Sequence, residues 1–92
     1  MITRERVKDS TKLTATEKMI LDKMLEWEGW RQDRGCADDT FIIANEAVLI
    51  EMGASDLFTA FGHLVDMGIL KKRNCDAVAY EWDNRALLEN YL

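Results

Sequence analysis

Apolar residues recur at helical spacing in the first third of the chain. Thr14 and Glu17 stand three apart and fit a capping box, in which the threonine hydroxyl and the glutamate carboxylate bond backbone N–H groups where a helix starts. One apolar stripe at the period of an α-helix then follows, made of Ile20, Leu21, Met24 and Leu25. The pattern predicts a helix that begins at Thr14 and turns one side to a core.

The middle of the chain reads as a short strand and two helices. Residues 40–43 are β-branched or aromatic, which predicts a strand, and residues 46–52 are apolar around most of a helix, which predicts a buried one. Residues 56–67 predict a third helix with these inward positions: Leu57, Ala60, Phe61 and Leu64. The boundaries have their own chemistry, with caps at Asn45 and Ser55 and glycine stops at Gly53 and Gly68.

The last quarter of the chain predicts a β-hairpin and a short helix. Residues 69–73 and 77–82 flank the turn-prone residues 74–76, and Val78, Tyr80 and Trp82 share one face at the period of a strand. Asp83 can cap a helix over residues 84–91, whose apolar side comprises Leu87, Leu88 and Tyr91.

Residues 1–12 are polar and mostly basic, with Arg4 and Arg6 among them and Ile2 and Val7 as the apolar exceptions. Because chain ends usually fray, we expect a flexible basic arm over 1–12 and a single domain over 13–92. The arm either touches phosphates or an acidic partner, or is simply solvated.

Composition limits the class of protein. At 92 residues and 48% hydrophobic content the chain suits one small domain with its own core. The net charge of −5 disfavours non-specific nucleic-acid binding, since phosphates are bound chiefly by Lys and Arg. No apolar run approaches a membrane span and the start of the chain is charged, so we expect no membrane association and a cytoplasmic location.

Catalytic signatures are lacking in the sequence. It has one histidine, no nucleophile motif and no glycine-rich phosphate loop, so we expect neither an enzyme nor a cofactor. Cys36 and Cys75 fit reduced thiols, although a bridge between them stays open. The two cysteines could meet His63 at a metal, but their scatter favours a plain surface histidine and no metal site.

Charge is distributed unevenly over the two middle helices. Between Arg34 and Lys71 there is no Lys or Arg. The same interval contains six acidic residues: Asp38, Asp39, Glu46, Glu51, Asp56 and Asp66. The two predicted helices are therefore arranged as in a helix-turn-helix, but their charge is negative, as in a protein that mimics nucleic acid, and not positive, as in one that binds it.

The order of these parts resembles a known family. The stretches LTATEKMILDKML (residues 13–25), IIANEAVLIEMGAS (residues 42–55) and HLVDMGILKKR (residues 63–73) are similar to the first helix, the turn and the exit into the wing of winged helix-turn-helix domains from phage and plasmid replication or regulatory proteins. The resemblance covers the chain from Leu13 onward. It implies a mainly α fold with a small β-hairpin, namely a three-helix core, a wing and a short C-terminal helix.

The chain departs from that family at the third helix. There the family usually has Arg, Lys, Gln or Asn for base contacts, whereas this chain has Asp56, Phe58, Thr59, Gly62 and His63. An outward phenyl ring on an acidic helix favours a protein contact, in which aromatic residues act as buried anchors. Phe58 could instead insert between bases, or fold back on the arm or the hairpin.

Two functional hypotheses follow. The first is a non-catalytic, phage-type or mobile-element protein that binds the basic surface of another protein, as a regulator or inhibitor of a nucleic-acid-handling complex, by DNA mimicry or in an anti-CRISPR-like manner. Its expected contact residues are Glu51, Asp56, Phe58, Thr59, His63 and Asp66. The second is a DNA-binding transcription or replication regulator, with these residues in contact: Arg4, Arg6, Thr59, His63, Lys71, Lys72 and Arg73.

Two further features keep two interpretations each, and a homodimer stays open. Trp27 and Trp30, beside Arg31 and Arg34, either form an aromatic and basic platform for bases or a peptide, or cover the core edge. The basic run 71–73 either lies along phosphates or keeps an edge strand soluble. A homodimer through the first or the last helix is compatible with both functional hypotheses.

Overall fold

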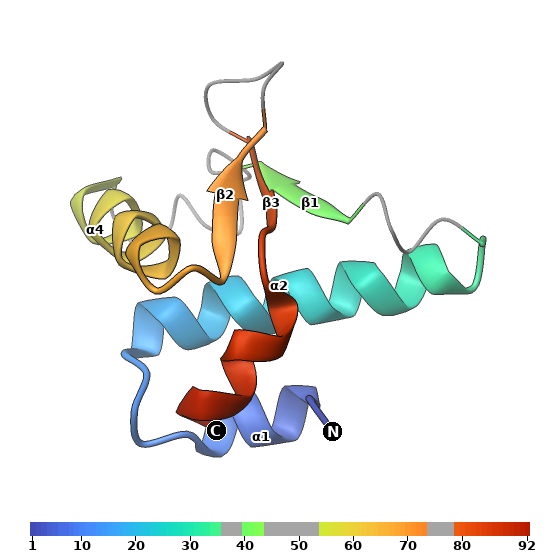
Figure 1. Cartoon of the computed structure of the whole chain (residues 1–92), viewed down its shortest axis with the longest axis horizontal. Coiled ribbons are helices and arrows are strands. Elements are labelled where there is room, and N and C mark those ends of the chain that lie inside the picture. The colour runs from blue at the N-terminus through green and yellow to red at the C-terminus, as the bar shows by residue number, and fades with distance from the viewer. Residues whose placement is uncertain (36–39, 44–53, 74–78) are drawn as a thin grey trace.

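The computed structural model describes residues 1–35, 40–43, 54–73 and 79–92. It is mainly helical, with a small three-stranded antiparallel sheet. The described elements are α1 (Arg4–Asp9), α2 (Ala15–Gln32), β1 (Phe41–Ile43), α4 (Ala54–Asp66), β2 (Leu70–Lys72), β3 (Ala79–Trp82) and the 3₁₀ helix η2 (Arg85–Tyr91). Figure 1 shows α2 crossing the molecule, with α1 and η2 on one side of it and α4 and the sheet on the other.

Helix α2 begins as the sequence predicts. The backbone N–H of Thr14 donates to Glu17 Oε1 at 2.8 Å, and the backbone N–H of Glu17 donates to Thr14 Oγ1 at 3.2 Å, so both halves of the capping box are present. Ile20, Leu21 and Met24 are fully buried. The predicted stripe is therefore the surface on which the other elements pack.

The sheet joins β1 to the two strands of the predicted hairpin. Its strand order is β1-β3-β2, so β3 is central and both neighbours run antiparallel to it. Tyr80 pairs with Ile42 on one side and with Lys72 on the other. Ile42 and Tyr80 are buried, and the Tyr80 ring stacks on Phe61 of α4 with centroids 4.3 Å apart. This stack locks the sheet onto α4.

Gly68 ends α4 in the left-handed conformation that the sequence predicts, with φ at 80°. The Gly68 N–H donates to Val65 O at 2.9 Å and the Ile69 N–H donates to Leu64 O at 3.1 Å, which together make a Schellman motif. The predicted start of this helix is wrong. The sequence predicts a start at residue 56 with Ser55 as the cap, whereas α4 begins at Ala54 and includes Ser55. The predicted helix over 46–52, with its boundaries Asn45 and Gly53, lies outside the described residues.

The predicted flexible arm over residues 1–12 is corrected by the structure, which has helix α1 there. Val7 is fully buried against the core, and Thr3 caps the helix through its hydroxyl. Arg4 donates to both carboxylate oxygens of Asp22 in α2, at 2.8 and 3.0 Å. One buried apolar side chain and a bidentate ion pair thus hold residues 4–9 against α2, although their polar composition predicts a solvent-exposed segment.

The C-terminal helix is present, but its start differs from the prediction. Asn84, not Asp83, precedes η2, and no side chain caps it. Leu88 is fully buried, while Arg85 makes a bidentate pair with Glu28 of α2 at 2.8 and 2.9 Å. Ser10, after α1, donates to the carbonyl of Tyr91. The two ends of the chain therefore lie together against α2 (Figure 1).

The pairing of Arg4 with Asp22 predicts a dependence of stability on pH. The hydrogen bond from Arg4 lowers the pKa of the Asp22 carboxyl below its ordinary value of 3.8. A carboxyl whose pKa is lowered by folding stabilises the protein above its unfolded pKa, and that contribution is lost as the pH falls through the lower folded value. Because Arg4 is 44% exposed and its charge is screened, Arg4→Gln should lower the free energy of unfolding by about 0.5–1 kcal/mol at pH 7.

Urea unfolding of wild type and Arg4→Gln at pH 7 and at pH 2.5 measures this contribution. We expect the difference between the two proteins to shrink at the lower pH. Lys72→Gln, which removes an equal charge from an exposed side chain, serves as the control. An equal difference at both pH values would show that Arg4 acts through packing alone.

Candidate protein-interaction face

The outward side of α4 carries an exposed aromatic ring. Phe58 is 64% exposed, and Gly62 and Asp66 follow it on successive turns of the same side. Val65 is 36% exposed and lies seven residues after Phe58, on the same shoulder of the helix. The prediction that Phe58 points outward is confirmed, and the alternative that it folds back on the rest of the chain is wrong.

The inward side of α4 determines that orientation. Leu57, Ala60, Phe61 and Leu64 recur at helical period and are all buried. A helix that buries this stripe must present the opposite stripe to solvent. Phe58 is therefore exposed because its neighbours on the other side of α4 are buried in the core. Turning α4 to bury Phe58 would break the stack of Phe61 on Tyr80.

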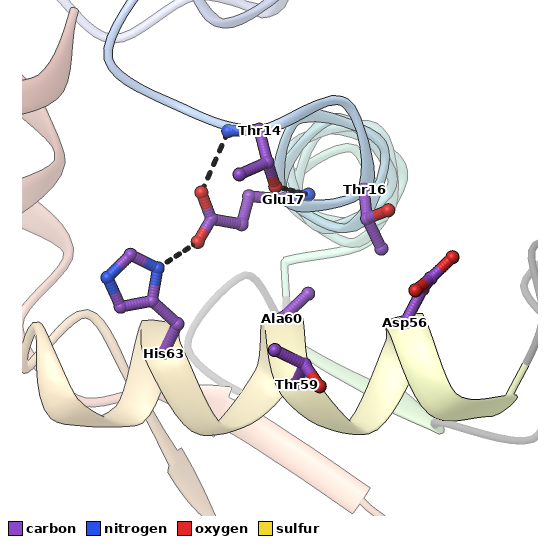
Figure 2. Close-up of a pocket in the computed structure, with 7 residues that line it drawn as sticks. All are labelled: Thr14, Thr16, Glu17, Asp56, Thr59, Ala60 and His63. Atoms are coloured by element: carbon purple, nitrogen blue, oxygen red, sulfur yellow. Dashed lines mark hydrogen bonds and ion pairs between the residues drawn. The ribbon is translucent and has the colours of Figure 1, made fainter.

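Acidic side chains stand at the two ends of α4, with Asp66 on the side of the exposed ring and Asp56 on the side that faces the start of α2 (Figure 2). Asp56 is exposed in the first turn of α4, where a carboxylate interacts favourably with the helix dipole. Asp66 is exposed at the last residue of α4. The sequence supplies no Lys or Arg anywhere in α4. We call the exposed side chains of Asp56, Phe58, Val65 and Asp66 the α4 face.

A histidine and a buried carboxylate connect α4 to the start of α2. Glu17 is 1% exposed and accepts a hydrogen bond from the ring of His63 through Oε2, while its other oxygen accepts from Thr14 (Figure 2). The ring nitrogen of His63 in this contact is Nδ1. His63 itself is 58% exposed. His63 therefore links α4 to α2, and its exposed ring edge remains accessible to a partner protein.

An open hollow lies between the two helices at this point. Its volume is about 240 Å³, and the side chains that line it converge in Figure 2: Thr14, Thr16, Glu17, Asp56, Thr59, Ala60 and His63. Hydroxyl and carboxylate oxygens dominate its polar lining. Such a hollow suits the end of a basic side chain, because it presents acceptors and the negative charge of Asp56.

The structure places the other predicted contact residues in different regions. Arg4 is paired with Asp22, and Arg6 is paired with Glu89 of η2 at 3.0 Å. Both guanidinium groups are therefore engaged within the chain, which weakens the contribution of the basic arm to the DNA-binding hypothesis. Glu51 lies outside the described residues.

The wing residues are divided between two environments. Lys71 and Lys72 are exposed on β2, which is an edge strand, and neither forms an ion pair with any residue in the described part of the chain. Arg73 instead places its guanidinium over the ring of Phe41, 4.3 Å from the ring centroid. The predicted basic run is thus two solvated lysines and one arginine that packs on the sheet.

Two features of the α4 region were missed by the sequence analysis. Val65 could have been found from its spacing of seven residues after Phe58. The bond between Glu17 and His63 spans 46 positions and had no local signal, because a glutamate at the third position of a capping box is already explained by the cap.

The C-terminal apolar residues are used mainly within the chain. Leu88 is fully buried, and Leu87 and Tyr91 are partly buried against the core. Leu88 is therefore not available for a contact between two copies, and the homodimer through the last helix stays a prediction.

In the described segments, no group of three or more His, Cys, Asp or Glu side chains is placed to hold a metal ion. Cys36 and Cys75 lie outside these segments. Nor does any helix in the described segments have the length and apolar character needed to cross a membrane.

Comparison of the chain with models of protein families, with curated proteins and with solved structures finds no match.

Proposed function

We propose that this chain is a non-catalytic winged-helix protein that binds a basic surface of another protein through the α4 face. The observation that carries the proposal is the exposed ring of Phe58, 64% accessible on a helix that bears Asp56 and Asp66 and no cation. Aromatic anchors surrounded by complementary charge are the usual centres of binding energy in protein interfaces.

The order of the described elements supports a winged helix. After α4 the chain turns at Gly68 into the antiparallel strands β2 and β3, the position of a wing, and β1 pairs with β3. Helix α2 supplies the first core helix. The middle helix of the winged-helix motif would be formed by residues 46–52, and this part of the proposal rests on the sequence alone.

The α4 face is suited to a partner that normally binds nucleic acid. Carboxylates at Asp56 and Asp66 present negative charge at the two ends of the helix that, in a DNA reader, would carry cations. The hollow beside Asp56, about 240 Å³ in volume, offers acceptors to a lysine or arginine end group. We therefore propose a regulator or inhibitor of a nucleic-acid-handling complex, acting by occupying its basic surface.

DNA binding through the wing is the second candidate. It is favoured by Lys71 and Lys72, which are exposed on an edge strand. It has lost support at Arg4 and Arg6, whose guanidinium groups are paired with Asp22 and Glu89. Two lysines alone give weak, strongly salt-dependent binding, so this candidate ranks below the first.

The proposal is tested on the partner recovered by affinity capture and identified by mass spectrometry. We expect Phe58→Ala to raise the dissociation constant about 30-fold, the effect of removing an interface anchor worth about 2 kcal/mol. Asp56→Lys should weaken binding similarly, because it places a cation against a basic surface. Isothermal titration calorimetry measures both effects.

Glu5→Lys makes the same charge change as Asp56→Lys on α1, an exposed site outside the α4 face, and should leave the dissociation constant within about twofold, the scale of rim charges. Circular dichroism confirms that each variant is folded. Equal affinity of wild type, Phe58→Ala and Asp56→Lys for the recovered partner would exclude the α4 face as the binding surface.

A further inference from the structure

The C-terminal half of α2 gathers aromatic and basic side chains on one face, away from α4. Trp27, Trp30 and Arg31 follow the spacing i, i+3 and i+4, which aligns them along one side of α2, and Arg34 lies in the turn just after the helix ends. The two indole rings meet edge to face, with centroids 6.3 Å apart. A hollow of about 350 Å³ lies beside them and is lined by the two tryptophans and Glu26.

Trp30 and Arg34 form the outer part of this face. Trp30 is 48% exposed, which is unusual for the largest apolar side chain. The guanidinium of Arg34 lies over the Trp30 ring, 3.7 Å from the ring centroid, and donates to the Trp30 carbonyl at 3.3 Å. Contacts of this kind hold an arginine in place while its charge stays in solvent, since Arg34 is exposed.

Phe41 of β1 connects α2 to the wing. The guanidinium carbon of Arg31 lies 4.9 Å from the Phe41 ring centroid, and that of Arg73 lies 4.3 Å from it. The strand register places Phe41, Glu81 and Lys71 side by side across the sheet, so that their side chains share one face. Cations that are 40 residues apart in the sequence are therefore brought to one continuous surface, which we call the α2–wing surface.

We propose that the α2–wing surface binds single-stranded nucleic acid. The Trp30 ring and the Arg34 guanidinium provide flat surfaces on which a base can stack, and stacking on aromatic rings and on arginine planes is the characteristic contact of single-strand binders. The hollow beside Trp27 admits a second base, whose ring N–H can donate to the Glu26 carboxylate. The strand then continues toward Lys71, which attracts its phosphates.

The chemistry of this surface favours a single strand over other anionic partners. A duplex hides the faces of its bases, so it would use the cations and leave the exposed indole without a role. An acidic peptide would likewise need the cations alone. Only an unpaired base uses both the half-exposed Trp30 ring and the guanidinium beside it.

This surface is separate from the α4 face. Trp30 lies 13 positions along α2 from Glu17, the residue that contacts α4, which corresponds to about 20 Å along the helix axis. Figure 1 shows α4 near the start of α2 and β1 farther along the helix. One chain of this size could thus contact a basic protein and a single strand at once, as an accessory of a nucleic-acid-handling complex would.

The test is a titration of the whole chain into a fluorescein-labelled dT12 oligonucleotide, followed by fluorescence anisotropy at several salt concentrations. We expect saturable binding at low salt, quenching of tryptophan emission, and a loss of affinity as the salt concentration rises. Trp30→Ala and Arg34→Ala should each weaken binding about tenfold, as removal of a stacking platform does. Thermal circular dichroism verifies that both variants are folded.

Lys12→Ala is the matched control for Arg34→Ala, because it also removes one positive charge but lies near η2. It should change the affinity by less than about twofold, the effect of a remote charge at moderate salt. A duplex of the same length and a poly-glutamate peptide are compared as competitors, and both should compete far less well than unlabelled dT12. Three results would each overturn the proposal: no binding at low salt, binding indifferent to Trp30→Ala and Arg34→Ala, or equal competition by the duplex or the peptide.

Discussion

Replacing Phe61 by alanine should lower the free energy of unfolding by about 3–5 kcal/mol, the range for truncating a fully buried phenylalanine. Phe61 is 0% exposed, and its ring stacks on Tyr80 at 4.3 Å with an interplanar angle of 16°. The substitution removes the contact that joins α4 to the central strand of the sheet. Because small domains are stable by only about 5–15 kcal/mol, this variant should be partly unfolded near 37 °C.

Phe58→Ala is the matched control, since it deletes the same side chain three residues earlier on α4. At 64% exposure it should cost less than about 0.5 kcal/mol, as surface substitutions usually do. Urea unfolding followed by circular dichroism compares the two. Similar losses for both variants would mean that α4 is rotated relative to the described structure, and the α4 face would then be wrongly assigned.

Glu17→Ala should lower the free energy of unfolding by about 1–3 kcal/mol, because it removes the carboxylate half of the capping box and the contact with His63. Glu17 is almost fully buried, and its two oxygens accept hydrogen bonds from Thr14 and His63. The substitution therefore frays the start of α2 and releases α4 from it. Urea unfolding measures the loss.

A double-mutant cycle with His63→Ala separates the two contributions. Because His63 is 58% exposed, we expect a coupling free energy of about 0.5–1 kcal/mol between it and Glu17, with the rest of the Glu17→Ala effect due to the cap. A coupling of zero would show that His63 does not tether α4 in solution. The hollow in Figure 2 would then not be closed by His63, and the proposal that it holds a basic side chain of the partner would be contradicted.

Local signals in the sequence were sufficient for several elements. The capping box at Thr14 and Glu17 involves residues three apart, so α2 starts where the sequence predicts. Gly68 stops α4 for a similarly local reason, because its left-handed backbone is unfavourable for any side chain. The strand preference of residues 40–43 likewise led to β1. Each of these features depends only on residues a few positions apart in the sequence.

Predictions failed where the deciding contact was distant. Helix α1 looked like a solvated arm because it has one strongly buried residue, Val7, and its ion pair joins Arg4 to Asp22 across 18 positions. The cap expected at Asp83 is absent, since the short η2 is held by Arg85 on Glu28 instead. In both cases a long-range ion pair, which leaves no pattern in the neighbouring residues, replaced the expected local cause.

The candidate site shows the same division. The outward positions of Asp56, Phe58 and Asp66 follow from the helical period and are confirmed as exposed. The bond between His63 and Glu17, and the meeting of Arg31 with Arg73 on Phe41, join segments far apart in the chain. Period alone carries no information about such meetings.

The sequence by itself determined which stripe of α4 is apolar, where α2 begins, and that the whole interval between Arg34 and Lys71 lacks a cation, because these depend on residue identity and on spacing within one element. Only the tertiary structure decided that Arg4 and Arg6 are spent on pairs within the chain, and that the cations of α2 and the wing gather around one ring. The reason is physical: an ion pair or a ring contact forms wherever packing brings two side chains within a few ångströms, whatever their separation in the sequence.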